Sequence, residues 1–413
     1  MITLIEALNF RCLRYIRQPL GPFHVLVGPN ASGKTTFLDV PAFLGRIVSE
    51  GIDTAVSERA EMFHDLVWQR GTRLGLAVEA AIPSEITRAS DDSRRDTIRY
   101  EMMLGTADEA GAPVIRQEFL WLLRKGHGSR PGKASGATEV GPPATILIEP
   151  RLGARPILHK LLTGPDMIRA EVGRGGFTRL MLGPRHSALA NVPEDTTKFP
   201  AATWFRRLLV EDLQRVLLNS SQMKKASLVG PARRLNPDGS NLPLLVERLR
   251  KEAPARFKDW IAHLRTALPD LKDVRTVRLP ENSHCWLMLH YRNGLAVPAW
   301  SASDGTLRLL ALTLLAYMED VKGLYLIEEP ENGMHPLNIE TVYQSLSSLY
   351  DAQALLATHS PVILSLVKPE EVLCFSKTPE GATDIVLGKD HPMLRDWRGQ
   401  PNLSVLFASG VLG

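Results

Sequence analysis

The residues with the most specific chemistry form the run GPNASGKT at positions 28–35, which fits the pattern G-x-x-x-x-G-K-[S/T] without a mismatch. Gly28 and Gly33 let the backbone adopt positive φ angles and approach phosphate oxygens closely. Lys34 adds a point charge for the β- and γ-phosphates, and the Thr35 hydroxyl is a hard oxygen ligand suited to Mg²⁺. The pattern predicts a loop that binds a nucleoside triphosphate through Gly28, Asn30, Ala31, Ser32, Gly33, Lys34, Thr35 and Thr36.

The flanking sequence supplies the elements that such a loop needs. The apolar run at residues 23–27 is typical of a buried strand. After the loop, apolar residues recur at helical spacing as far as about residue 50. The start of this helix directs N–H groups and its positive end at the loop, which favours an anion there. The alternative is a glycine turn that matches the pattern by chance.

Two other apolar runs end in polar residues that could act on a bound triphosphate. Residues 324–327 are followed by Glu328 and Glu329, and residues 353–358 are followed by His359. One carboxylate can hold Mg²⁺ and the other can polarise an attacking water, while the imidazole can donate a hydrogen bond to the γ-phosphate. The alternatives are a strand that enters an acidic turn and a structural histidine.

A polar turn precedes the carboxylate strand by about 20 residues. Ser303 is typical of a helix N-cap, and Gly305 lies two residues after it. Together they offer backbone N–H groups to an anion. An ordinary capping turn is the alternative.

Composition limits the class of protein. The chain has 413 residues, 44% hydrophobic and 23% charged, which predicts a soluble globular protein of two to three domains. Its three cysteines lie far apart, which argues against a zinc site or a disulfide framework and fits a reducing cytosol. The N-terminus lacks the basic region of a signal peptide, and the apolar stretch at 309–318 is too short to span a bilayer. We therefore expect a cytoplasmic protein without a membrane partner.

The charge is unevenly distributed along the chain. Residues 94–260 contain 28 Lys and Arg against 17 Asp and Glu, although the whole chain carries only +4. This basic middle region is a candidate surface for double-stranded DNA. A solvated arginine-rich face explains the same composition, and the sequence does not decide between the two.

Local patterns predict the remaining elements. Strands are expected at residues 2–8, 74–82, 97–104, 114–123, 144–148, 273–279 and 285–291. Helices are expected at 58–68, 201–225, 243–268 and 307–318. Residues 126–143, rich in Gly, Ser, Pro and Lys, predict a loop, and the chain from 372 onward predicts one or two edge strands and a closing helix.

Taken in order, GPNASGKTT, SDGTLRLLALTLL, LYLIEEPENGMHP and LLATHSP resemble the motifs of the ABC-type ATPases of the SMC, RecF and OLD (overcoming lysogenization defect) group. The chain is most similar to compact OLD-like AAA-domain ATPases, and the resemblance covers nearly its whole length. It implies an α/β fold, an ABC-type P-loop ATPase head with a mixed sheet, an antiparallel β-subdomain and an inserted α-helical lobe. The implied domains are an N-terminal ATPase lobe (1–200), the helical lobe (201–270) and a C-terminal ATPase lobe (271–413).

The resemblance also implies a role for each motif residue. Lys34 and Thr35 would be the Walker A pair, Glu328 the Walker B metal ligand beside Thr35, and Glu329 the catalytic base. Residues 331–335 would form the D-loop. The other implied roles are the signature for Ser303 and Gly305, the switch histidine for His359, and the Q-loop for Gln69.

Three departures from the family pattern stand out. The signature reads SDGT instead of SGGQ, Walker B begins with Glu328 where aspartate is usual, and the Q-loop is not evident. OLD proteins also carry a C-terminal nuclease domain, whereas this chain ends about 55 residues after His359. A nuclease, if one is involved, would be another polypeptide.

The resemblance implies an ATPase that uses ATP and Mg²⁺ and forms a homodimer, in which Ser303 and Gly305 contact the nucleotide of the partner copy. It further implies a DNA-linked role, with a separate effector such as a nuclease or toxin and a link to anti-phage defence. A second hypothesis is a nucleotide-gated scaffold that hydrolyses ATP slowly and holds an effector inactive. The ATPase subunit of a membrane transporter fits less well, because some 270 residues separate the Walker A motif from the signature.

Overall fold

The computed structural model describes residues 1–89, 93–107, 111–124, 141–148, 154–173, 175–279, 284–319 and 321–391. Contacts divide the chain into two compact units. The first unit contains Met1–Gly21, Pro29–Leu213 and Phe375–Ile385, and the second contains Pro22–Gly28, Gln214–Cys374 and Val386–Gly413. The phosphate loop therefore begins at the last residue of one segment of the second unit and continues in the first unit.

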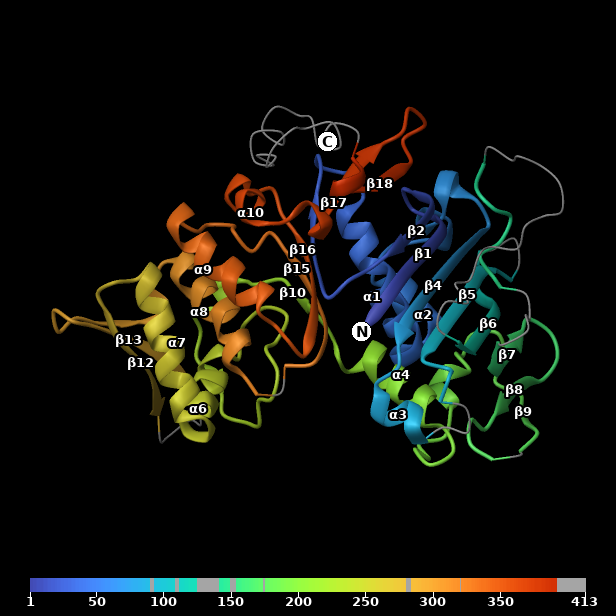
Figure 1. The fold of residues 1–413 in the computed structure, drawn as a ribbon, viewed down its shortest axis with the longest axis horizontal. Helices are drawn as coiled ribbons and strands as arrows, with labels where there is room; N and C mark the ends of the chain where they lie inside the picture. Colours follow the sequence, from blue (N-terminus) through green and yellow to red (C-terminus); the bar gives the residue numbers. More distant parts are fainter. Residues whose placement is uncertain are drawn as a thin grey trace. The chain divides into compact units, whose positions relative to one another are not determined.

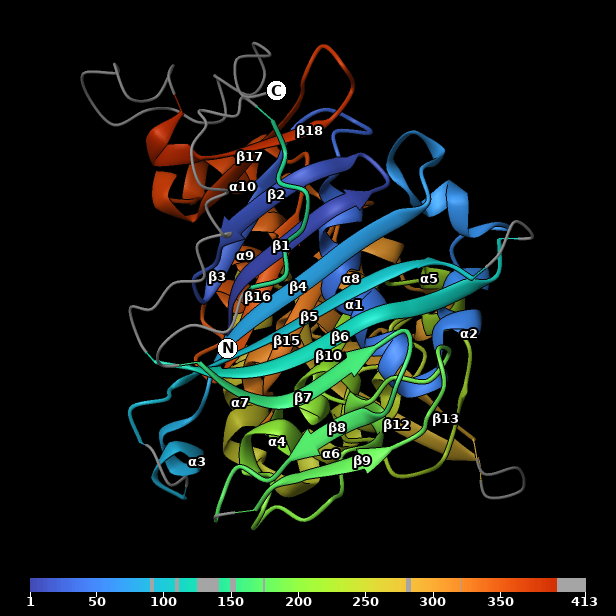
Figure 2. The ribbon, with the colours of Figure 1, turned by 90° about the vertical axis from the view of Figure 1, so that its right-hand side faces the viewer.

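The first unit is built on an eight-stranded antiparallel sheet, which faces the viewer in Figure 2. Its long central strands are buried along most of their length, as expected for β-type residues between turn signals. The strands expected at residues 2–8, 74–82, 97–104 and 114–123 are confirmed. In sheet order the strands are β2 (Leu13–Pro19), β1 (Ile2–Phe10), β4 (Arg73–Ala81), β5 (Thr97–Thr106), β6 (Pro113–Leu123), β7 (Arg155–Leu161), β8 (Asp166–Arg169) and β9 (Phe177–Leu180).

Helix α1 (Lys34–Glu50) contacts β1, β4 and α4 (Pro200–Val210). The two helices approach closely, because a Cβ atom on Gly45 would lie 2.3 Å from the carbonyl oxygen of Leu209. Two shorter helices, α2 (Ile52–Ser57) and α3 (Ser84–Ala89), complete the α-helices among the described residues of this unit.

The helix expected at residues 58–68 is wrong. The chain forms two 3₁₀ turns instead, η1 (Phe63–Leu66) and η2 (Trp68–Arg70). Gln69 and Arg70 have positive φ angles of 50° and 55°, which an α-helix does not allow. Burial of Phe63 and Leu66 stabilises this irregular path although the local pattern suggests a helix.

The second sheet has the order β10-β15-β16-β3-β17-β18 (Figure 1). Strands β15, β16, β3 and β17 pair in parallel, so this sheet provides the parallel part of the predicted mixed fold. The strands expected at 324–327 and 353–358 are confirmed. The bounds are β10 (Leu213–Val216), β15 (Gly323–Glu328), β16 (Ala352–Ala357), β3 (Phe23–Val27), β17 (Val372–Lys377) and β18 (Thr383–Leu387).

In its described part, the second unit adds an antiparallel sheet and six α-helices. The sheet order is β11-β13-β12, with β14 paired to β13, and one apolar core joins these helices to both sheets. The helices are α5 (Ser220–Met223), α6 (Leu242–Glu252), α7 (Pro254–Ala267), α8 (Asp304–Leu314), α9 (Pro336–Ser347) and α10 (Pro361–Leu366). The strands are β11 (Ser227–Leu228), β12 (Leu271–Leu279), β13 (His284–Tyr291) and β14 (Ala296–Pro298).

Other sequence-based expectations for this region are corrected. The helix expected at 201–225 ends at Val210, because the following residues pair into the second sheet as β10. The helix expected at 243–268 is two helices, since Pro254 begins a new one. The segment 201–270 thus contributes α4 to the first unit and α6 and α7 to the second.

Residues 144–148 form no strand, and the backbone N–H of Ile148 instead donates to Glu101. The expected loop at 126–143 lies mostly outside the described residues, as does the closing helix expected after residue 391. Among the described helices, none combines the length and the apolar character needed to cross a membrane.

Candidate active site

The phosphate loop has the backbone that its glycine spacing predicts. Gly28 and Gly33 have φ angles of 148° and 106°, and Ala31 between them also lies in the left-handed region at 60°. Gly33 cannot be replaced without strain, because its φ disfavours a side chain and a Cβ atom there would lie 2.2 Å from Thr383 Oγ1. The amine of Lys34 folds back onto the loop and donates to the carbonyl oxygen of Pro29 at 2.9 Å.

Helix α1 begins at this loop without a side-chain cap and without an acidic residue in its first turn. Helix N-termini leave backbone N–H groups unsatisfied within the helix, so an uncapped start is suited to an external anion. Within the described residues, the hydroxyl of Ser32 is also buried without a hydrogen-bond partner. The Thr35 side chain is exposed. This set of donors and hard oxygens fits a magnesium nucleotide.

Three parallel strands of the second unit end at one edge of their sheet. Glu328 at the end of β15 is in register with Ala357 of β16, and Ala357 is in register with Leu26 of β3. Each strand is followed by a predicted site residue: Glu329 after β15, His359 two residues after the end of β16, and Gly28 after β3. Two bonds extend the ladder beyond the strands, from Glu329 N to the Ala357 carbonyl at 2.8 Å and from Thr358 N to the Leu26 carbonyl at 3.1 Å.

The two carboxylates at this edge have different surroundings. Glu328 accepts a hydrogen bond from Arg215 of the neighbouring strand β10 at 3.0 Å. Glu329 has a φ angle of 47°, which is uncommon for a residue with a side chain and is found most often at functional sites. The amide of Asn332 donates to Glu329 at 3.3 Å. Glu328 is thus paired with a cation, whereas Glu329 begins a tight turn.

Glu331 connects the turn after β15 to the end of β16. Its Oε1 accepts from the hydroxyl of Thr358 at 2.6 Å and from the backbone N–H of His359 at 2.8 Å. Thr358 in turn accepts from the N–H of Ser360, the N-cap of α10. We call this arrangement of Glu331, Thr358 and His359 the carboxylate latch.

The signature turn lies at the start of α8. Ser303 is the N-cap and accepts from Thr306 N at 3.1 Å. Gly305 is packed so tightly that a Cβ atom would lie 2.5 Å from the carbonyl oxygen of Gly333, which belongs to the turn after β15. Asp304 is exposed, and a hydrogen bond from Lys224 at 2.7 Å lowers its pKa. Ser303 and Gly305 therefore sit beside the D-loop segment of their own chain.

Two other sequence-based expectations concern residues away from this edge. Gln69, the Q-loop candidate, is exposed in a 3₁₀ turn of the first unit. In the basic middle region, Arg99 and Lys160 are fully buried. Arg99 binds Glu6, Glu79 and Glu101 at 2.7–3.0 Å, and Lys160 binds Asp166 at 2.8 Å. The charge surplus of this region thus overstates its exposed positive charge.

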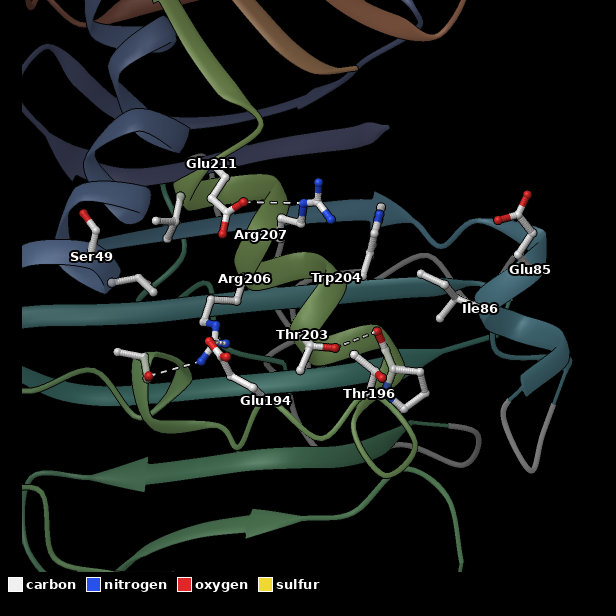
Figure 3. Close-up of a pocket in the computed structure, with 14 residues that line it drawn as sticks. Ser49, Glu85, Ile86, Glu194, Thr196, Thr203, Trp204, Arg206, Arg207 and Glu211 are labelled. Carbon is white, nitrogen blue, oxygen red and sulfur yellow. Dashed lines mark hydrogen bonds and ion pairs between the residues drawn. The ribbon is translucent and has the colours of Figure 1, made fainter. Parts of the chain in front are cut away.

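A cavity of about 710 Å³ in the first unit lies beside α4, with further walls from the ends of α1 and α3 (Figure 3). Its two arginines pair with glutamates, Arg206 with Glu194 at 2.9 Å and Arg207 with Glu211 at 3.5 Å, and Glu85 adds a third carboxylate to the lining. None of the predicted site residues lines it. With three carboxylates against two guanidinium groups, the cavity is unsuited to a triphosphate.

Sequence reasoning missed several residues that contact the predicted site. Arg215 falls in a segment expected to be helical, so its position beside Glu328 was not foreseen. Glu331 was assigned to the D-loop, but its bond to His359 depends on the pairing of two distant strands. Thr383 and Cys12 approach the phosphate loop from positions far away in sequence and belong to no motif.

Comparison with solved structures defines the fold as that of an SMC head, an ABC-type ATPase domain. The chain is similar to an Smc head bound to the C-winged helix domain of ScpA, with a TM-score of 0.54, 14% identity, and coverage of 93% of this chain and 97% of that one. It is also similar to an Smc head with an extended coiled coil bound to the C-terminal domain of ScpA, derived from Pyrococcus furiosus. That match has a TM-score of 0.51 and 11% identity, and covers 93% of this chain and 95% of the other. The predicted ABC-type fold is confirmed.

Sequence comparison defines the family. Residues 23–365 match the family described as "AAA domain, putative AbiEii toxin, Type IV TA system", and the chain belongs to it. A stretch of 38 residues is 53% identical to a protein from Thermus scotoductus named OLD nuclease. This match spans 9% of the present chain and only 7% of that relative. The chain is thus a member of this AAA-domain family with the fold of an SMC head.

Proposed function

We propose that this protein hydrolyses ATP in a Mg²⁺-dependent reaction and uses the nucleotide to switch between separate and dimerised states. The observation that carries the proposal is the shared edge of β3, β15 and β16. The ends of these strands lead into the phosphate loop, the two carboxylates and the histidine. Ligands of parallel α/β sheets bind at the carboxyl ends of the strands.

The phosphate loop would bind the β- and γ-phosphates. Support comes from the uncapped start of α1, the positive φ of Gly33 and the buried, unpartnered hydroxyl of Ser32. Lys34 would exchange its bond with the Pro29 carbonyl for phosphate oxygens, a stronger bond because both partners are charged. This step would bind ATP and ADP alike, since both carry the β-phosphate.

Mg²⁺ would take its protein ligands from Thr35 and Glu328. Magnesium in nucleotide sites keeps several waters and needs only one or two protein oxygens besides the phosphates. Consistent with this, the described part of the chain holds no cluster of three or more His, Cys, Asp and Glu that could bind a metal alone. Arg215 would orient the Glu328 carboxylate through the ion pair between them.

Glu329 would accept a proton from the attacking water, and His359 would donate a hydrogen bond to the γ-phosphate. The tight turn at Glu329 and the carboxylate latch at His359 fix the backbone of both residues before the reaction. Electrostatic and positional catalysis of phosphoryl transfer depends on such preorganisation.

The dimer would form with Ser303 and Gly305 of each copy facing the nucleotide of the other. The N–H groups at the start of α8 would then contact the γ-phosphate, as helix N-termini do with anions. ATP would stabilise the closed dimer and hydrolysis would release it, which is a population shift driven by differential affinity. The partners that respond to the dimerisation state would be DNA and a separate effector, a nuclease or toxin. The protein would then act in the cytoplasm in anti-phage defence.

The test is the Glu329→Gln variant, with Glu340→Gln on the exposed side of α9 as the matched control. We expect kcat to fall by about 100-fold or more in Glu329→Gln, while ATP affinity stays near the wild-type value. We also expect this variant to accumulate as a dimer in MgATP, measured by light scattering. Wild-type turnover in Glu329→Gln would show that Glu329 is not the catalytic base.

The alternative is a slow, nucleotide-gated scaffold that holds an effector inactive. The description of the family as a toxin-system protein is the observation that favours it. Fast hydrolysis stimulated by duplex DNA supports the first function, whereas slow hydrolysis indifferent to DNA supports the scaffold. DNA affinity that does not change between 50 and about 200 mM salt would exclude a phosphate-contacting surface.

A further inference from the structure

Thr383 is a buried residue that contacts the phosphate loop from the far end of the chain. It is the first residue of β18, and its side chain is 4% exposed. Its hydroxyl donates to the carbonyl oxygen of Ser32 at 2.8 Å, across 351 positions of sequence. Its backbone N–H donates to the carbonyl oxygen of Cys12, also at 2.8 Å.

Cys12, in the turn between β1 and β2, contacts both Thr383 and the phosphate loop. Its thiol lies 3.6 Å from the hydroxyl of Thr36, one of the predicted nucleotide-binding residues. Thr383, Cys12 and the loop residues Ser32, Gly33 and Thr36 all belong to the first unit. We call the contacts of Thr383 and Cys12 with the loop the threonine clasp.

The clasp acts on the peptide bond between Ser32 and Gly33. This peptide is trans, as are all peptides described in the structure, so the Ser32 carbonyl and the Gly33 N–H point in opposite directions. Because the carbonyl is bound to Thr383, the N–H of Gly33 is directed away from Thr383. The space that a Cβ atom of residue 33 would need is occupied by the Thr383 hydroxyl itself.

We propose that Thr383 is a positioning residue for nucleotide binding, which presets the Gly33 N–H to donate to a phosphate oxygen. The proposal rests on the proposed function, because it assumes that the loop binds a nucleotide. Without the hydroxyl the Ser32–Gly33 peptide could rotate, and the loop would have to be reordered when the phosphate binds. Such reordering weakens binding and leaves the chemical step unchanged.

Hydrogen bonds within the hairpin turn that leads to Thr383 hold this residue in place. The chain reaches Thr383 through a tight turn, in which Thr378 N donates to the Ala382 carbonyl at 2.8 Å and Gly381 N donates to the Thr378 carbonyl at 2.8 Å. Thr378 also accepts from Ala382 N through its hydroxyl at 3.3 Å. Thr378 is thus a threonine in the same hairpin whose hydroxyl does not contact the phosphate loop, which makes it a matched control.

The experiment compares wild type with Thr383→Val, Thr383→Ser and Thr378→Val. Dissociation constants for MgATP and MgADP are measured by titration calorimetry, kcat and KM by phosphate release, and Tm without nucleotide by calorimetry. Thr383→Val should bind both nucleotides about tenfold more weakly, as expected for one lost hydrogen bond, with kcat at saturating ATP within twofold of wild type. Thr383→Ser should restore binding, and Thr378→Val should bind as wild type does.

Wild-type affinity in a folded Thr383→Val protein would overturn the clasp, and so would an equal loss in Thr378→Val. If Thr383→Val does not unfold cooperatively, Thr383→Ala replaces it, because alanine removes the hydroxyl without placing a methyl group against the Ser32 carbonyl. The same tenfold loss is expected there, and wild-type affinity there overturns the clasp. Failure of the wild-type protein itself to bind either nucleotide would instead contradict the proposed function.

Discussion

The phosphate loop differs in construction from the sheet edge that carries Glu328, Glu329 and His359, which we call the carboxylate edge. In the proposed complex the loop would bind phosphate through backbone N–H groups, and its conformation depends on Gly28 and Gly33. The carboxylate edge depends on side chains that meet across strands, such as Arg215 with Glu328 and Glu331 with His359. Local sequence specifies most of the loop, to which Thr383 is added from a distant strand, whereas only the folded sheet assembles the carboxylate edge.

The same contrast separates the two helices that begin at predicted nucleotide contacts. Helix α1 starts without a side-chain cap, while α8 starts with Ser303 as its N-cap. A helix start that is already capped by its own side chain has fewer N–H groups left for a ligand. The start of α1 is therefore better suited to an anion than the start of α8.

The largest effect is expected at the phosphate loop. Lys34→Ala should weaken MgATP binding by about 100-fold or more, because it removes the cation whose bonds to phosphate are charge-assisted. Lys198, an exposed lysine of the first unit paired with Asp195 at 3.4 Å, supplies the control variant Lys198→Ala. Titration calorimetry measures both. Unchanged affinity in Lys34→Ala would contradict the view that the loop provides nucleotide binding while the carboxylate edge provides catalysis.

An intermediate effect is expected at the carboxylate latch. Glu331→Ala should lower kcat about tenfold and leave the ATP dissociation constant within twofold, because it frees the backbone of His359 without touching the loop. Thr358→Val removes one of the two bonds to Glu331, together with the acceptor of the Ser360 N–H, and should fall between this variant and wild type. Phosphate release and calorimetry measure the two quantities, with Glu340→Ala as control. A loss of affinity larger than the loss of kcat would show that the two regions do not divide binding from catalysis.

The smallest effect is expected at the cap of α8. Ser303→Ala should lower the free energy of unfolding by about 1 kcal/mol, because the N–H of Thr306 loses its acceptor. Ser303→Asp keeps an acceptor at the N-cap and should restore most of this stability. Urea unfolding without nucleotide measures both variants. Equal stability of wild type and Ser303→Ala would mean that the cap contributes nothing and that α8 resembles α1 at its start.

The sequence predicted the parts of the molecule that depend on short-range patterns. The loop, α1, the strands that lead to Glu328 and His359, and the cap at Ser303 all follow from residues within one turn or strand of each other. The prediction failed where tertiary pairing overrides local preference. The segment around Leu213 has helical spacing, yet it becomes β10 because β15 offers it a paired edge.

The candidate site was incomplete for the same reason. Arg215 lies 113 positions from Glu328, and Thr383 lies 351 positions from Ser32. No periodicity or motif connects such residues. Buried arginines such as Arg99 also make the charge count of residues 94–260 a poor measure of exposed positive charge. Composition does not distinguish a surface cation from one that binds three interior carboxylates.

The tight packing of Gly305 on Gly333 has a mechanical consequence. The two backbones are too close for one to shift by itself, since only 2.5 Å would separate a Cβ atom of residue 305 from the Gly333 carbonyl oxygen. A pull on the first turn of α8 by a neighbouring copy would therefore reach the peptide four residues beyond Glu329. The contact between Gly305 and Gly333 would thus couple the binding of a second copy to the position of the residues that cleave the nucleotide of the first copy.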